Sequence, residues 1–157
     1  MIEMKSAAYS YGDELLSELN ISISQGSFYF LTGPSGSGKT TFLKMCYGSL
    51  VPTSGALTIF GKESSDLTRD EMAYLRRKIG VVHQDCQFLD HLNVNDNIAL
   101  PIMVSGQNSL SDNVNLKELL NWVGLSHRSK ALPPELSGGE RQRAALARAI
   151  IMSPDVI

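Results

Sequence analysis

The start of the chain alternates between apolar and polar residues in the way that β-strands do. Over residues 1–25 two such stretches flank a turn at Gly12 and Asp13, and residues 20–24 read NISIS. An alternation with period two turns one face of a strand toward a core and the other toward solvent. The pattern predicts an antiparallel pair of strands.

Further along the chain, short apolar runs alternate with stretches of helical spacing. The runs predicted as strands are residues 27–32 (SFYFLT), 56–60 and 79–83 (IGVVH). The stretches predicted as helices are residues 39–48, 69–78 and 138–152. Residues 155–157 look like the first residues of another strand. This alternation is typical of an α/β fold with parallel strands.

Between the run at 79–83 and the last helix, the pattern changes. Residues 85–132 are mostly helical and loop-rich, with a weakly structured stretch at 106–113. We therefore divide the chain into a core of residues 1–84, a helical subdomain of residues 85–137 and a final helix of residues 138–153.

Composition narrows the class of protein. The chain has 157 residues, 43% of them hydrophobic, and a net charge of −2, which fits one soluble unit and gives no basic surface for nucleic acid. No apolar run approaches the ~20 residues needed to span a bilayer. Cys46 and Cys86 show no metal-ligand spacing and fit a reducing interior.

Residues 33–40 (GPSGSGKT) match the phosphate-loop pattern G-x-x-x-x-G-K-[ST], between a predicted strand and a predicted helix. Glycines permit positive φ, so successive N–H groups can turn toward phosphate oxygens, Lys39 adds a charge, and Thr40 offers a hydroxyl to Mg²⁺. The alternative, a glycine-rich surface turn, is disfavoured by the flanking elements. The residues predicted to bind nucleotide here are Gly33, Ser35, Gly36, Ser37, Gly38, Lys39, Thr40 and Thr41.

A second motif, LSGGE, occupies residues 136–140 and opens the last predicted helix. Ser137 offers a hydroxyl, Gly138 and Gly139 allow close backbone approach, and the helix N-terminus favours an anion. Taken alone, the motif favours an ordinary helix cap. Its position after a phosphate loop favours a second phosphate contact.

Together these motifs resemble those of ATP-binding cassette (ABC) ATPases. LSGGERQR resembles the family's signature, and Gln84, directly after IGVVH, resembles its glutamine loop. The resemblance implies a P-loop NTPase fold and a homodimer that sandwiches two ATP molecules between phosphate loops and signatures. It also implies that Gln84 contacts the Mg²⁺ or the attacking water, while Thr40 contacts the Mg²⁺. Tyr11 matches the aromatic residue that stacks on adenine, with Tyr9 as second choice and an ordinary strand aromatic as the alternative.

Three longer stretches narrow the resemblance to the FtsE group of bacterial cell-division ATPases: GSFYFLTGPSGSGKTTFLK, LRRKIGVVHQDCQFLDHLNVNDNIALP and ELSGGERQRAALARAI. This resemblance implies an ATP-binding subunit that lies peripherally on the cytoplasmic face of the membrane and works with an integral-membrane FtsX-like or permease subunit. ATPases of lipoprotein release and macrolide export share much of the pattern and remain the alternative. Glu140 stands where the broader family has Gln.

The resemblance also places several catalytic residues outside the 157 residues. In the family, an apolar strand ends in Asp and then the catalytic Glu, a loop then crosses the dimer interface, and a switch His follows; all of these lie outside the 157 residues. We therefore expect an ABC core without its C-terminal strands, which binds ATP without efficient hydrolysis. Two interpretations stay open: a portion of a working ATPase, or a nucleotide-binding remnant.

Overall fold

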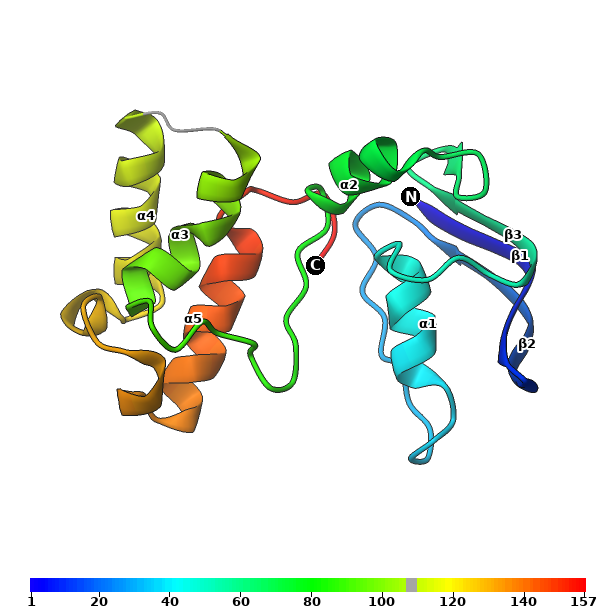
Figure 1. The fold of residues 1–157 in the computed structure, drawn as a ribbon, viewed down its shortest axis with the longest axis horizontal. Helices are drawn as coiled ribbons and strands as arrows, with labels where there is room; N and C mark the ends of the chain where they lie inside the picture. The colour runs from blue at the N-terminus through cyan, green and yellow to red at the C-terminus, as the bar shows by residue number, and fades with distance from the viewer. Residues whose placement is uncertain (107–109) are drawn as a thin grey trace. The chain divides into compact units, whose positions relative to one another are not determined.

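The structure is a computed structural model that describes residues 1–106 and 110–157, without the side chains of residues 11, 13–15 and 110–114. The chain forms two compact units, residues Met1–Arg76 and Arg77–Ile157. Figure 1 shows a sheet with helices α1 and α2 in the first unit and a group of helices in the second.

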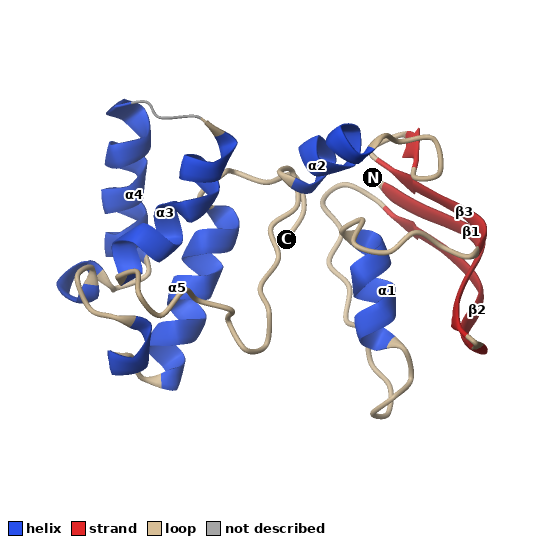
Figure 2. Ribbon diagram, in the orientation of Figure 1, coloured by secondary structure: helices blue, strands red, loops and turns tan. Residues whose placement is uncertain are grey.

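The first unit is built on a four-stranded sheet in which all neighbours run antiparallel (Figure 2). Its strands are β1 (Ile2–Tyr11), β2 (Asp13–Ile23), β3 (Ser54–Ile59) and β4 (Lys62–Glu63), in the order β2-β1-β3-β4. Only Gly12 separates β1 from β2, which confirms the predicted pair of strands and their turn.

The register of this sheet buries one face of the central strands. Ile2 pairs with Ile23 on one side and Ile59 on the other, and Met4 pairs with Leu57. Ile2, Met4, Leu57 and Ile59 are all at most 2% exposed, because alternate residues of each strand point to the same side. The predicted period of two therefore corresponds to a real core.

Helices α1 (Lys39–Cys46) and α2 (Arg69–Arg76) complete the first unit. Gly48 follows α1 with φ of 68°, and a Cβ there would lie 2.4 Å from the sulfur of Met72 on α2. The Arg76 guanidinium also donates to the Gly48 carbonyl. The end of α1 is therefore held against α2 at a left-handed position that favours glycine.

Two predicted strands are wrong in this structure. Residues 27–32 pair with no strand of the described chain, and Phe28 and Phe30 are 80% and 84% exposed. Residues 79–83 contribute only a parallel bridge between Ile79 and Val156. The predicted parallel pairing is thus limited to that bridge. Both segments have β-forming composition, but a strand also needs a hydrogen-bonded neighbour, which composition does not supply.

The second unit consists of helices α3 (Val94–Ser105), α4 (Leu110–Trp122) and α5 (Gly138–Ile150), with short 3₁₀ turns at Ser126–Arg128 and Pro133–Glu135. Gly106 ends α3 in a left-handed conformation. Of the stretch at 106–113 predicted to be weakly structured, residues 107–109 lie outside the described residues and residues 110–113 belong to α4.

A single apolar cluster joins the three helices of the second unit. Ala144 and Ala147 on α5 are at most 1% exposed, and such small side chains let α3 approach α5 closely. The buried members of the cluster are Val94, Ile98, Leu116, Leu120, Val123, Leu125, Leu136, Ala144 and Ala147. This core fixes the start of α5, where the second motif lies.

Candidate functional site

The phosphate-loop motif forms the turn that leads into α1. Gly38 is the N-cap residue with φ of 83°, and its carbonyl accepts the first helical hydrogen bond, from Phe42 at 2.9 Å. A Cβ on Gly38 would lie 2.5 Å from Cδ2 of Leu16 on β2. Glycine is therefore required both by the left-handed backbone and by the close approach to β2.

Lys39 folds back over this loop. Its ammonium donates to the carbonyls of Gly33 at 2.8 Å and Pro34 at 2.6 Å and lies 3.4 Å from Oγ of Ser37. No acidic residue lies in the first turn of α1, so the helix dipole and the ammonium both favour an anion here. The loop thus has the local charge that a phosphate requires.

The remaining residues predicted in the phosphate loop divide by exposure. Ser35, Gly36, Ser37 and Thr40 are exposed, and a Cβ on Gly36 would meet no atom within 4 Å, so the approach is open. Thr41 is only 8% exposed and belongs to the packed side of α1. Exposure allows the first four to meet a nucleotide, whereas the Thr41 side chain contributes to packing.

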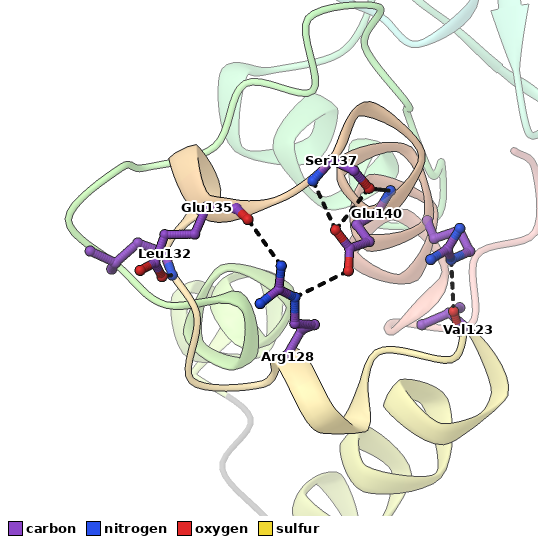
Figure 3. A network of polar contacts seen from close by, with 7 residues as sticks. Val123, Arg128, Leu132, Glu135, Ser137 and Glu140 are labelled. Atoms are coloured by element: carbon purple, nitrogen blue, oxygen red, sulfur yellow. Dashed lines mark hydrogen bonds and ion pairs between the residues drawn. The ribbon is translucent and has the colours of Figure 1, made fainter.

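The signature motif forms a capping box at the start of α5 (Figure 3). The Ser137 hydroxyl accepts from the Glu140 N–H at 3.3 Å and donates to Oε2 of Glu140 at 2.8 Å. The Ser137 N–H also donates to Oε2, at 2.8 Å. Two unpaired donors at the helix end are thereby satisfied, which fixes the entry into α5.

Glu140 is held from its other side by Arg128. Arg128 Nε donates to Oε1 at 3.1 Å, and Nη2 donates to the Glu135 carbonyl at 3.1 Å (Figure 3). Hydrogen bonds from Ser137, followed by the bond from Arg128, lower the pKa of Glu140 to about 2. A carboxylate at this position therefore stays ionised at neutral pH and supports the cap.

The two signature glycines leave the helix end accessible. Ser137, Gly138 and Gly139 are exposed, and a Cβ on Gly138 would meet no atom within 4 Å. At Gly139 the nearest atom would be an Arg143 nitrogen, 3.6 Å away. The backbone donors of the first turn can consequently be reached by an incoming anion.

Gln84 lies exposed in a turn in the second unit. Tyr9 belongs to β1, while the side chain of Tyr11 lies outside the described residues. Sequence reasoning missed two residues that hold the loop after Gln84: Arg148 on α5 and Asn97 on α3. Both bind main-chain atoms of that loop, so the residue types of the loop gave no sign of these contacts.

The structure assembles the predicted site residues in two groups. Gly33 to Thr41 belong to the first unit, and Gln84 with the signature belongs to the second. Within the described residues, no group of three or more His, Cys, Asp or Glu side chains is arranged to hold a metal ion. Thr40 offers a hydroxyl oxygen in the first unit and Gln84 an amide oxygen in the second, and both are oxygen ligands of the kind that Mg²⁺ prefers.

A comparison with protein families identifies the fold and the motifs together. Residues 16–157 match the model of the ABC transporter family. The chain belongs to this family. The match includes both the phosphate loop and the signature, so the resemblance seen in the motifs is confirmed.

Among curated ABC relatives, the cell division ATP-binding protein FtsE of Bacillus subtilis is 40% identical over all of this chain and 70% of its own length. The lipoprotein-releasing system ATP-binding protein LolD 1 of Rhodopirellula baltica is 41% identical over 97% of this chain and 68% of its own. The chain thus spans about two thirds of the length of these relatives.

A solved structure confirms the ABC ATPase fold. The ATP-binding cassette MJ0796, described as a dimer in a post-hydrolysis state bound to ADP and Pi, superposes with a TM-score of 0.88 and 32% identity. The match covers 98% of this chain and 71% of that one. Within residues 1–106 and 110–157, no helix is both long and apolar enough to cross a bilayer.

Proposed function

We propose that this chain is the ATP-binding part of an FtsE-like ABC subunit that works with an integral-membrane FtsX-like partner at the cytoplasmic face of the membrane. The observation that supports it best is a phosphate loop and a capped signature helix in one chain, with 40% identity to FtsE along its whole length. LolD-like lipoprotein release is the second candidate, because the identity to LolD 1 is 41%.

In this proposal the phosphate loop binds the triphosphate. The N–H groups between Gly33 and Thr40 surround phosphate oxygens, and Lys39 exchanges its contacts with the Gly33 and Pro34 carbonyls for phosphate oxygens. The exposed Thr40 hydroxyl and Gln84 amide are suited to hold Mg²⁺, which neutralises phosphate charge when bound.

The signature contributes the second half of the proposed site. The exposed Ser137 hydroxyl and the first N–H groups of α5 would meet the terminal phosphate of an ATP carried by a second copy of the chain. MJ0796, described as a dimer, supports this arrangement. Because Ser137 now donates to Glu140, arrival of a phosphate requires the hydroxyl to change its acceptor.

ATP binding tests the proposal directly. Lys39→Ala removes a charged donor, and a hydrogen bond to a charged group contributes ~1.5–3 kcal/mol, so affinity should fall about 10- to 150-fold. Lys44→Ala, on the same helix, is the matched control and should bind normally. The measurement is a titration with a fluorescent ATP analogue. Equal affinity of the wild type and the Lys39 variant would contradict the proposal.

A further inference from the structure

The loop that follows Gln84 is held by an arginine that is 61 and 62 residues away from the two residues it binds. The Arg148 guanidinium, on α5, donates from Nη1 to the Gln87 carbonyl at 2.9 Å and from Nη2 to the Cys86 carbonyl. Its central carbon lies 4.8 Å from the centroid of the Phe88 ring. One side chain therefore contacts three consecutive residues of the loop.

Arg148 has no acidic partner among the ion pairs of the described residues. Its contacts are carbonyl dipoles and an aromatic face, which are the groups that a guanidinium binds in fixed geometry. Burial lowers the pKa of Arg148. The side chain is thus placed for binding this loop rather than for pairing with a carboxylate.

The loop adopts a conformation that needs such support. Cys86 and Gln87 have φ of 59° and 44°, in the left-handed region that non-glycine residues seldom occupy. Each such residue costs ~1–3 kcal/mol and persists only where surrounding contacts enforce it. Here both strained residues present their carbonyls to the same guanidinium.

We propose that Arg148 is a positioning residue: it ties residues 86–88 to α5, so that Gln84 keeps a fixed place relative to the signature at the start of the same helix. This inference rests on the proposed function for the meaning of Gln84 and Ser137. The physical link itself, from α5 to the loop, lies wholly within residues 77–157.

The test uses the full 157-residue chain and the native thiol of Cys86, which is 6% exposed. Arg148→Ala should speed alkylation of Cys86 and amide exchange of residues 84–89 by about tenfold or more, because two charge-assisted bonds are lost. Arg148→Lys keeps the charge but loses the planar guanidinium with its two donor nitrogens, so its alkylation and exchange rates should lie between those of the wild type and Arg148→Ala. Arg143→Ala is the matched control, since Arg143 on α5 donates to the Val123 carbonyl instead.

A second measurement separates positioning from stability. Spin labels at Gln84→Cys and Arg141→Cys, with both native cysteines replaced by serine, report the distance between loop and signature helix. We expect one narrow distribution that Arg148→Ala broadens while helical circular dichroism stays constant. An unbroadened distribution, an equal effect of Arg143→Ala, or faster exchange throughout α4 and α5 would overturn the proposal. None of these readouts needs nucleotide, so a failed ATP titration would count against the proposed function alone.

Discussion

Replacing Asn97 should destabilise the second unit far more than the small size of the asparagine side chain suggests. Asn97 is 1% exposed and its amide joins α3 to the loop before it. Oδ1 accepts from the Leu89 N–H at 2.9 Å, and Nδ2 donates to the Leu89 carbonyl at 3.0 Å and the Leu92 carbonyl at 2.8 Å. A contact to the Asn93 carbonyl at 3.1 Å is local to the helix start.

The three bonds to the loop set the magnitude. At ~0.5–1.5 kcal/mol each, their loss in Asn97→Ala amounts to about 1.5–4.5 kcal/mol of unfolding free energy. Alanine also improves helix propensity by up to ~0.7 kcal/mol, which opposes the loss. Asn95→Ala carries the same gain on the same helix and loses only one weak contact, to Asp96 at 3.4 Å. The difference between these two variants therefore isolates the loop bonds.

Urea unfolding followed by circular dichroism gives the required free energies. Asn97→Asp adds a sharper test, because it keeps the shape and one acceptor but turns a carboxylate toward the Leu89 and Leu92 carbonyls. We expect it to be at least as destabilising as Asn97→Ala. If Asn97→Asp matched the wild type, or if Asn97→Ala unfolded like Asn95→Ala, Asn97 would only fill space and our reasoning would be wrong.

Two further predictions concern the signature cap and the exposed aromatics. Glu140 has a lowered pKa, so its contribution to stability is complete above about pH 4.5 and is lost as pH falls toward about 2. In thermal unfolding followed over this pH range, Glu140→Gln should lack the loss of stability that is due to Glu140. The loss due to Glu71, whose pKa is also lowered, should remain. Phe28 and Phe30, exposed at 80% and 84%, should promote self-association, so replacing both with serine should reduce light scattering. Tyr74→Ser, at a residue 60% exposed in α2, should not.

Local patterns predicted the elements whose partners lie close in sequence. β1 and β2 pair across one residue, so period-two alternation and a turn at Gly12 were sufficient. Residues 27–32 show the limit of the method. Their composition favours a strand as strongly as that of β1 or β2 does. Pairing, however, depends on a neighbouring strand that is distant in sequence, and β-propensity measures the fit to such a neighbour.

The candidate site divides in the same way. The phosphate loop and the signature were found because their chemistry requires particular residues at fixed spacing. Arg148 and Asn97 were missed because they bind main-chain atoms, which every residue carries. Arg148 acts across 61 and 62 positions of sequence, so no local pattern records it. Arg128, which secures Glu140, is likewise recognised only in three dimensions.

The hydrogen bonds from α3 and α5 that hold the loop after Gln84 all meet its backbone, at the carbonyls of Cys86, Gln87, Leu89 and Leu92 and at the Leu89 N–H. Its path is therefore dictated by residues outside it, on α3 and α5. A loop supported in this way can exchange many of its own outward side chains, such as the 40% exposed Leu89, without losing its course. Substitutions at such exposed positions therefore change the surface of this loop while the geometry beneath it stays constant.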